Sequence, residues 1–343
     1  MKLKKFVTLL ILGAMALSLA ACGEEPAASE SPSQTAAVSS STEGVTAHYP
    51  VTIQNYNYAK EPIDLVFETT PERVLVLNQN NIETMLALGL EDRIVAAAGL
   101  DHEVKEEYKE AFSKIHYLTD FTVDRESVLM LEPDMILGWW STFGEKRLDG
   151  TEFWQDRGIK TYMAENSNSI VTNRTLQNEY DYILDLGKIF DVEDKAQAIV
   201  TSIQTEVNGI LEKTKGQKQK TALIIEFLGD QIHTYDATTL GGNMVTTLGG
   251  NLLDAEATVG LEDLIKLNPD VIYVVYMDGD EEGMAEKSAD MVLKNEALAS
   301  LNAVKNQSVI AIPLGDMYTS AMRTVDGIRI FAQGLYPDLY AEE

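Results

Sequence analysis

Aromatic side chains follow two apolar stretches of the sequence that are typical of buried strands. Trp139 and Trp140 come soon after Met135–Leu137, and Tyr276 comes directly after Val271–Val275. Trp140 and Tyr276 each stand seven residues after a proline, so the two rings occupy equivalent places. Open parallel sheets bind ligands at the carboxyl ends of their strands. The spacing therefore predicts two aromatic rings facing each other across a site for a large, flat or partly apolar ligand.

Cationic side chains lie close to aromatic ones at the same predicted strand ends. Arg147 follows the two tryptophans, and Tyr318 and Arg323 follow a further apolar stretch, Val309–Pro313. Arginine beside aromatic rings suits an anionic, aromatic ligand, because guanidinium groups form charge-assisted hydrogen bonds and stack on rings. We expect the ligand-binding residues to be Trp139, Trp140, Arg147, Tyr235, Tyr276, Tyr318 and Arg323.

The sequence lacks the usual residue patterns of an enzyme. It has no Ser-His-Asp order, no recognisable pair of catalytic carboxylates and no Gly-x-Ser-x-Gly segment, so no catalytic residue is predicted. Of the four histidines, His48 falls in the predicted tether region, and only His102 falls at a predicted strand end. A bare transition-metal ion needs several converging His and carboxylate ligands. We expect neither a cofactor nor a metal site of the protein's own, and a metal held inside an organic chelate remains open.

A helix–turn–strand unit occurs twice in the sequence, 136 residues apart. Residues 126–136 and 262–272 each carry Leu or Val on one face of a short helix, then a Pro-Asp pair, then an apolar run. The proline ends the helix because it cannot continue it and restrains the residue before it. The apolar run is typical of a buried parallel strand. One unit used twice at this spacing predicts two similarly built lobes with one cleft between them.

Strands and helices alternate along the rest of the chain. This alternation predicts an α/β fold of two Rossmann-like lobes, residues 47–190 and 217–343, with parallel sheets and a ligand cleft between the lobes. Residues 191–216 carry no strand signal and are predicted as one long rigid helix that joins the lobes and allows only a small hinge motion. The loop 78–81 is expected to cap the helix that follows it. The expected strands are two within 51–67, then 73–77, 93–98, 116–118, 135–137, 160–163, 221–227, 232–235, 271–275 and 309–313.

The first residues have the layout of an export signal. Lysines at positions 2, 4 and 5 precede an apolar run, Phe6–Leu19, which small residues separate from Cys22. The run is too short to span a bilayer comfortably. Its end is similar to a bacterial lipobox, in which Cys22 carries lipid such as palmitate and becomes the mature N-terminus; a plain secretory signal with an incidental cysteine is the alternative. Residues 1–22 are thus a predicted signal peptide, and the Ser-, Pro- and Glu-containing residues 23–46 a predicted disordered tether.

The composition limits the partners of the mature protein. A formal net charge of −27 repels nucleic acid and anionic lipid surfaces, so neither is expected as a partner. It favours solubility and partners that present arginine or lysine. Cys22 is the single cysteine, which excludes disulfides, Cys-ligated zinc and cysteine nucleophiles after lipidation. We expect a monomer held at the membrane by its lipid anchor alone.

Taken in order, these segments resemble the substrate-binding lipoproteins of ABC importers. The resemblance runs from about Val51 to Leu339. It is carried by the two Pro-Asp units and by three further segments, Thr70–Val74, Glu83–Gly89 and Leu248–Asn251. The subgroup that the chain resembles has two lobes joined by one helix and binds ferric siderophores, haem or cobalamin.

The resemblance implies a receptor on the outer face of the bacterial cell membrane that captures a metal chelate and passes it to a permease and its ATPase. In the family a glutamate on each lobe docks onto permease arginines, and Glu126 and Glu262 stand at these positions, each seven residues before its proline. The arginines favour a ferric siderophore, with cobalamin or another corrinoid second and haem third. Trp139 stands where cobalamin binders of the family place a tryptophan. A secreted hydrolase that uses acidic residues, and a surface adhesion or sensor module, are the alternatives from other classes.

Overall fold

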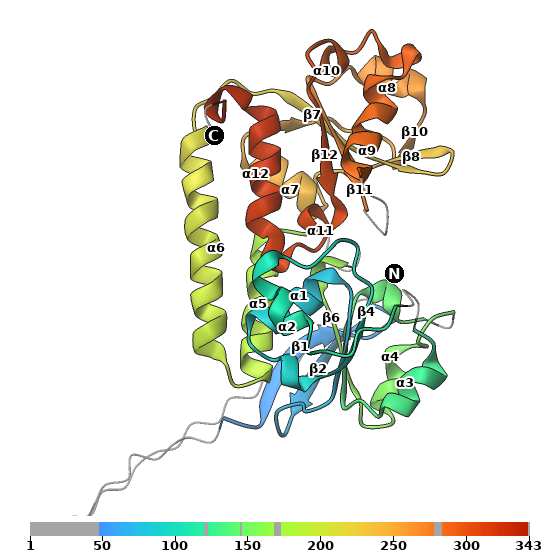
Figure 1. The fold of residues 1–343 in the computed structure, drawn as a ribbon, viewed down its shortest axis with the longest axis vertical. Coiled ribbons are helices and arrows are strands. Elements are labelled where there is room, and N and C mark those ends of the chain that lie inside the picture. The colour runs from blue at the N-terminus through green and yellow to red at the C-terminus, as the bar shows by residue number, and fades with distance from the viewer. Residues whose placement is uncertain (1–47, 120–122, 145, 168–172, 278–282, 342–343) are drawn as a thin grey trace, which may run out of the picture. The chain divides into compact units, whose positions relative to one another are not determined.

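The computed structural model describes residues 48–119, 123–144, 146–167, 173–277 and 283–341. The predicted signal peptide, Cys22 and the predicted tether therefore lie outside the described residues. Within the described part of the chain no helix is long and apolar enough to cross a membrane. Residues 47–343 form one compact unit, and Figure 1 shows its two lobes, each built around a sheet.

The N-terminal lobe contains a parallel sheet, as expected. Its elements are β1 (Val51–Tyr56), β2 (Pro62–Phe67), β3 (Val74–Leu77), α1 (Gln79–Ala87), β4 (Ile94–Ala98), α2 (Lys109–Phe112), α3 (Arg125–Leu131), β5 (Met135–Gly138), α4 (Thr151–Gln155) and β6 (Lys160–Met163). The strand order is β4-β3-β5-β6, and every neighbouring pair is parallel. β1 and β2 form a separate antiparallel hairpin. The strand expected at residues 116–118 is wrong, since this segment contributes one isolated bridge, between Ala97 and Tyr117.

The sheet of the C-terminal lobe is mixed rather than parallel. The elements from the joining helices onward are α5 (Leu176–Ile189), α6 (Glu193–Thr214), β7 (Thr221–Leu228), β8 (Gln231–Thr234), α7 (Leu240–Thr247), β9 (Asn251–Leu252), β10 (Thr258–Val259), α8 (Leu261–Leu267), β11 (Val271–Tyr276), α9 (Met284–Leu293), α10 (Asn302–Lys305), β12 (Val309–Pro313), α11 (Leu314–Met317) and α12 (Thr324–Leu335). β7, β11 and β12 are parallel, whereas β8 runs antiparallel to β7 and β10 antiparallel to β8. Only Gly229 and Asp230 separate β7 from β8, and so short a connection can join antiparallel strands alone.

The repeated Pro-Asp unit has the same structure in both lobes. Glu132 directly follows α3 and Asn268 directly follows α8, and both capping residues adopt the left-handed conformation directly before the proline. The Asp134 carboxylate accepts hydrogen bonds from the two backbone N–H groups directly before β3 (2.7 and 3.0 Å). The Asp270 carboxylate accepts two from Thr221, the first residue of β7 (2.9 Å each). Each aspartate thus fixes the end of the repeated helix to the start of a central strand.

Side chains of the central strands alternate between two apolar layers, as the period of a strand requires. In β3, Val74 and Val76 belong to one layer, whereas Leu75 and Leu77 belong to the other. The second layer is separate in each lobe. The first layer is one continuous cluster, which we call the shared core; it includes residues of both sheets and of α5, α6 and α12.

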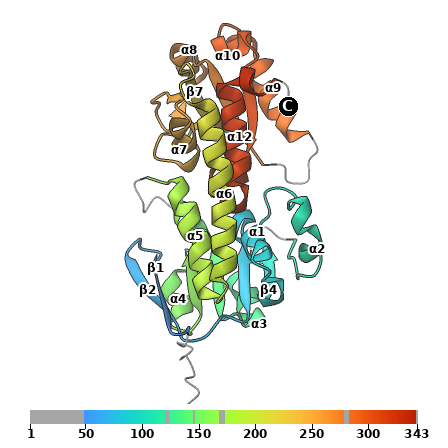
Figure 2. The ribbon, with the colours of Figure 1, turned by 90° about the vertical axis from the view of Figure 1, so that its left-hand side faces the viewer.

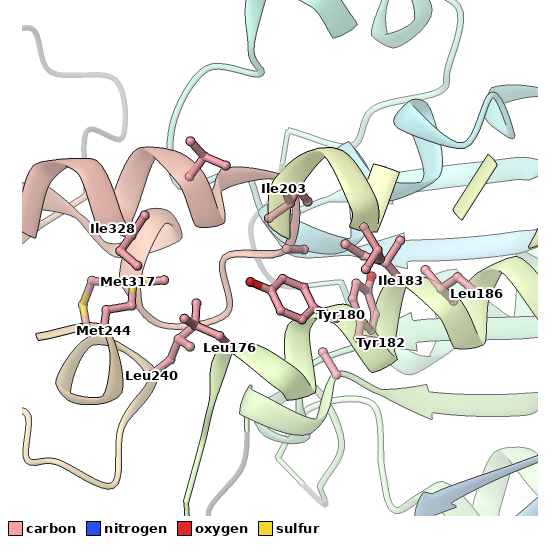
Figure 3. Packing of buried hydrophobic residues seen from close by; sticks show 14 of the residues in the cluster. Leu176, Tyr180, Tyr182, Ile183, Leu186, Ile203, Leu240, Met244, Met317 and Ile328 are labelled. Carbon is pink, nitrogen blue, oxygen red and sulfur yellow. The ribbon is translucent and has the colours of Figure 1, made fainter. Parts of the chain in front are cut away.

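Figure 3 shows a part of the shared core, where side chains from elements far apart in sequence pack together. α5 contributes Leu176 and Tyr180, α6 contributes Ile203, and the C-terminal lobe contributes Leu240 and Ile328. α6 has 22 residues, about 33 Å at 1.5 Å per residue, and runs along both lobes beside α5 and α12 (Figures 1 and 2). The lobes are therefore joined by packing as well as by the α6 helix.

Candidate functional site

Trp139 lies at the carboxyl end of β5, and the end of the neighbouring strand fixes its polar groups. Its indole Nε1 donates a hydrogen bond to Asn80 Oδ1 (2.7 Å), and its backbone N–H donates one to Asn78 Oδ1 (3.2 Å). Asn78 stands between β3 and α1 with a φ of 76°. Its side chain does not cap α1, contrary to the expectation for loop 78–81. These asparagines instead orient the indole of Trp139.

Two aromatic contacts join the lobes at their strand ends. The ring of Trp139 lies 5.2 Å from that of Tyr318 with planes 55° apart, and the ring of His102 lies 5.6 Å from that of Tyr276, edge to face. Tyr318 OH also donates a hydrogen bond across the lobes to Ser167 O (3.3 Å). We call Trp139, Tyr318, His102 and Tyr276 the interlobe site. A flat ligand that separates these rings would keep an aromatic contact on each side.

Trp140 has different neighbours from those expected. Its ring stacks on Tyr58 with centroids 5.1 Å and planes 8° apart, and its Nε1 donates a hydrogen bond to Tyr58 O (3.1 Å). Lys60 Nζ lies 4.7 Å from the centroid of the indole. The expected pair of Trp140 and Tyr276 is thus replaced by the pair of Trp139 and Tyr318.

Arg147 lines two hollows of the N-terminal lobe. A cavity of about 100 Å³ at the ends of β3, β4 and β5 is lined by Trp139, Ser141 and Arg147 among others. A wider pocket of about 620 Å³ is lined by Tyr58, Trp140, Ser141 and Arg147. Since Ser141 and Arg147 line both, Arg147 lies where the two hollows adjoin, and Trp139 of the interlobe site lines the smaller one. This position suits an anionic group of a ligand.

Two charged residues that the sequence analysis did not single out, Arg174 and Glu226, lie beside Tyr318 and Tyr235 respectively. The guanidinium of Arg174 is 5.8 Å from the Tyr318 ring, and its backbone N–H donates a hydrogen bond to Thr238 O (2.9 Å). Tyr235 OH donates a hydrogen bond to the carboxylate of Glu226 (2.5 Å), which is buried. Burial raises the pKa of Tyr235 and of Tyr318, so both hydroxyls stay protonated and can donate hydrogen bonds. Of the predicted site residues, Tyr235 and Tyr318 thus share one polar environment.

Arg323, expected as a ligand-binding cation, forms an ion pair between the lobes instead. Its Nε and Nη2 donate hydrogen bonds to both oxygens of Glu83 (2.8 and 2.7 Å), and Nη2 also donates to Glu103 O (2.7 Å). Asp316 Oδ1 lies 3.5 Å from Nη1. Glu83 is fully buried and the Arg323 side chain is 11% exposed. The charge of Arg323 is therefore balanced within the protein, and the pair joins the residue before α12 to α1.

Three buried carboxyl groups surround these contacts. Burial raises the pKa of Asp101 to about 6 and that of Asp316 to about 7, with the nearby Arg323 acting in the opposite direction. Burial likewise raises the pKa of Glu179, on α5, to about 7. Two hydrogen bonds that Glu179 accepts, from Asn166 Nδ2 and from the backbone N–H of Ala321, act in the opposite direction. These groups carry less than full charge near neutral pH, which lowers the cost of burying them between the lobes.

Glu126 and Glu262, the expected docking residues, occupy equivalent places in the two lobes. Each lies in the first turn of its helix, α3 or α8, and each is exposed. In Figures 1 and 2 both helices lie on the side of their lobe away from α6. The structure thus presents two carboxylates on matching helices.

His48, expected in the tether region, belongs to the N-terminal lobe. Its Nε2 lies 2.7 Å from Lys188 O at the end of α5, and its Nδ1 lies 3.3 Å from carboxylate oxygens of both Asp191 and Glu193. Among the described residues these three form the group of His and carboxylate side chains close enough to share one ion. A protonated His48 satisfies the same geometry as an ion pair, so the group indicates no metal by itself.

The polar residues of α1 carried a signal that sequence reasoning missed. Gln79, Asn80, Asn81 and Glu83 are consecutive or nearly so and are all at most 2% exposed. Buried polar side chains need partners, and these contact the strand ends, α5 and Arg323. A run of polar residues on a buried helix directly after a central strand is therefore a marker of the site. For Arg174 and Glu226 we find no comparable signal.

Two α/β lobes whose strand ends meet at aromatic side chains define a class of proteins that bind a small molecule between lobes. The profile of the family described as Periplasmic binding protein matches residues 74–314. The chain belongs to this family. The crystal structure of a periplasmic binding protein from Veillonella parvula DSM 2008 is similar to the chain with a TM-score of 0.76 and 38% identity, over 85% of this chain and 93% of that one.

Two proteins of Bacillus subtilis (strain 168) are similar over most of their length. One, described as the uncharacterized ABC transporter substrate-binding lipoprotein YvrC, is 26% identical over 301 residues, 86% of this chain and 88% of YvrC. The petrobactin-binding protein YclQ is 23% identical over 331 residues, 93% of this chain and 94% of YclQ. The family resemblance expected from the sequence is thus confirmed. The chain is an extracytoplasmic substrate-binding protein and not an enzyme.

Proposed function

We propose that this chain is the receptor of an ABC importer and that it captures a ferric siderophore. The observation that carries the proposal is the contact of Trp139 with Tyr318 between the strand ends of the two lobes. Arg174 lies beside this contact, and Arg147 lines the adjoining cavity. Aromatic surfaces flanked by guanidinium groups suit a chelate that is both anionic and aromatic. The description of YvrC supports the transporter, and that of YclQ supports the siderophore.

The geometry suggests how the chelate is held. It would enter between Trp139 and Tyr318, so that the rings exchange their mutual contact for contacts with the ligand. The Tyr318 hydroxyl would donate a hydrogen bond to the ligand in place of its bond to Ser167 O, and the Tyr235 hydroxyl, whose proton is shared with Glu226, would accept one. Arg147 and Arg174 supply positive charge. We expect the shared core, which includes residues of both lobes, to limit their relative motion to a small rotation. A corrinoid is the second candidate ligand and haem the third.

Titration of the purified protein with ferric siderophores tests the proposal. Trp139 belongs to the proposed contact, so tryptophan fluorescence should be quenched and should saturate at one equivalent of an anionic, aromatic ferric chelate. The metal-free siderophore is the matched control and should bind more weakly, because its arms are not held in one shape. If cobalamin or haem saturates the quenching and the ferric siderophores do not, that compound would be the ligand of the receptor. Turnover of any chelate into a product would contradict a receptor.

We also propose that lipid on Cys22 holds the receptor at the outer face of the membrane and that residues 23–46 act as its tether. The support is the signal-like sequence before Cys22 and the word lipoprotein in the description of YvrC. The mass of the mature N-terminal peptide checks this, since diacylation adds two fatty acyl chains to Cys22.

Docking on the permease is proposed for Glu126 and Glu262. The double variant Glu126→Ala with Glu262→Ala should reduce chelate uptake by intact cells at least about tenfold, because two charge pairs with the permease are lost. Its affinity for the chelate should stay unchanged, since both residues lie on helices outside the interlobe site. Glu132→Ala, which removes one exposed carboxylate directly after α3, is the control for loss of nearby surface charge and should leave uptake intact. A fall in chelate affinity in the double variant would contradict the docking role.

A further inference from the structure

Exposed large apolar side chains are concentrated on the two helices that carry the docking glutamates. Eight such side chains occur among the described residues, and four of them lie on α3 and α8, which have seven residues each. They are Leu129 and Met130 on α3, and Leu261 and Ile265 on α8. Single exposed apolar residues need no explanation, but a concentration on two short matching helices indicates a contact surface.

Two of these side chains are equivalent by the repeat. Leu129 and Ile265 are 136 residues apart, the same offset as Glu126 and Glu262, and they are 39% and 40% exposed. Val128 and the equivalent Leu264 are fully buried beneath the helices. Both helices therefore present the same face outward. The matching exposures show that this face was built alike in the two lobes.

The glutamate and the apolar residue of each helix are neighbours on that face. They are three residues apart, and side chains at this spacing lie side by side on an α-helix. Asp134 and Asp270 fix both helices to their sheets in the same way, so the two faces are rigid and equally oriented with respect to their lobes. Each lobe thus offers one carboxylate and one branched apolar side chain as a unit.

We propose that Leu129 and Ile265 are apolar contacts with the permease, each filling a recess beside the cation that pairs with the neighbouring glutamate. This inference rests on the proposed function, because it takes the permease as partner. Two equivalent faces on one chain fit two equal subunits of a symmetric partner. A second copy of this chain is a poor fit, because each face carries a glutamate and the chain has a net charge of −27.

The two kinds of contact have different consequences. Exposed charge pairs weaken as salt screens them, and they act mainly on the association rate. Apolar contacts are insensitive to moderate salt and act mainly on the lifetime of the complex. Glu126 and Glu262 would therefore guide the receptor to the permease, whereas Leu129 and Ile265 would keep it there.

Binding of the chelate-loaded receptor to the complete transporter in lipid nanodiscs tests the inference. The variant Leu129→Ser with Ile265→Ser should bind about tenfold more weakly at every salt concentration, with faster dissociation and an unchanged salt dependence. Glu126→Ala with Glu262→Ala should instead lose most of the salt dependence. Leu228→Ser with Met291→Ser is the matched control, since these side chains are 47% and 46% exposed on other elements. It should bind like the unchanged protein.

The outcomes separate this inference from the proposed function. Unchanged binding of Leu129→Ser with Ile265→Ser, while the glutamate variant loses affinity, overturns the apolar contacts and leaves the receptor intact. Equal loss in the Leu228→Ser control also overturns them, because the effect would then be general. No binding of any form, including the unchanged receptor, overturns the permease partnership itself. Sedimentation showing that the serine variant dissociates a dimer of this chain would assign the face to self-association instead. Melting temperatures confirm that every variant is folded.

Discussion

Replacing Glu83 with glutamine is expected to lower the free energy of unfolding by about 3–5 kcal/mol. Glu83 is fully buried and accepts two hydrogen bonds from the guanidinium of Arg323, which is itself 11% exposed. It also accepts bonds from Gln79 Nε2 and from the backbone N–H of Lys105 (2.9 and 3.0 Å). Glutamine keeps the shape but loses the charge, so a buried cation is left without its main counter-ion. Urea denaturation monitored by circular dichroism measures the loss.

The pair of Glu72 and Arg93 provides the control for this prediction. Its closest N–O distance is 3.7 Å and the Glu72 side chain is 74% exposed. Glu72→Gln should therefore cost less than about 1 kcal/mol. Combining Glu83→Gln with Arg323→Met should restore much of the loss, because the buried cation is removed and Asp316, whose pKa burial raises to about 7, can take up a proton. Equal effects of Glu83→Gln and Glu72→Gln would show that the ion pair between the lobes contributes little.

Trp139→Ala is expected to weaken binding of the ferric chelate at least about 30-fold, the effect of losing a residue that dominates a contact. Its ring meets Tyr318 between the lobes and its indole is held by Asn80, so the surface is preorganised for a ligand. Trp140→Ala should change the affinity at most about threefold, because its ring is already stacked on Tyr58. Isothermal titration calorimetry compares the two variants directly.

A further variant separates the ring of Trp139 from its hydrogen bond. Trp139→Phe keeps an aromatic surface but cannot donate to Asn80, and we expect most of the affinity to remain. If Trp139→Phe lost as much affinity as Trp139→Ala, the effect would come from the hydrogen bond to Asn80 that orients the indole, and not from the aromatic surface. If Trp140→Ala lowered the affinity more than Trp139→Ala, the chelate would lie in the pocket that Tyr58 and Trp140 line and not between the lobes.

Much of the fold could be predicted because its strands are short apolar runs between helices. Val74–Leu77 and Val271–Tyr276 have no polar residue except tyrosine, which leaves a buried strand as the simplest interpretation. The direction of each strand was harder to predict from the sequence, and β8 was wrongly expected in a parallel sheet. Gly229-Asp230 between two strand-like runs was a hairpin signal that would have corrected it. The segment at 116–118 was too short for its apolar character to decide anything.

The site could be predicted only as a region. In an extended segment neighbouring side chains point to opposite sides, so Trp139 and Trp140 could not be distinguished without knowing which side faces the other lobe. Counting from the proline selected Trp140, whereas the interlobe contact belongs to Trp139. Arg323 was expected to bind the ligand, and its ion pair was not foreseen because its partner, Glu83, lies 240 residues away in sequence. The spacing of residues within one segment gives no information on an ion pair between residues so far apart in the sequence.

The shared core has a thermodynamic consequence. By topology the molecule is two domains, yet on one face of each sheet the apolar layer belongs to the shared core, which includes helices α5, α6 and α12. Unfolding of one lobe would expose the apolar face of the other sheet that belongs to the shared core. We therefore expect both lobes to unfold in one cooperative transition on heating or in denaturant. The free energy gained when a chelate binds at the strand ends then protects the whole molecule, including the distant termini of its helices.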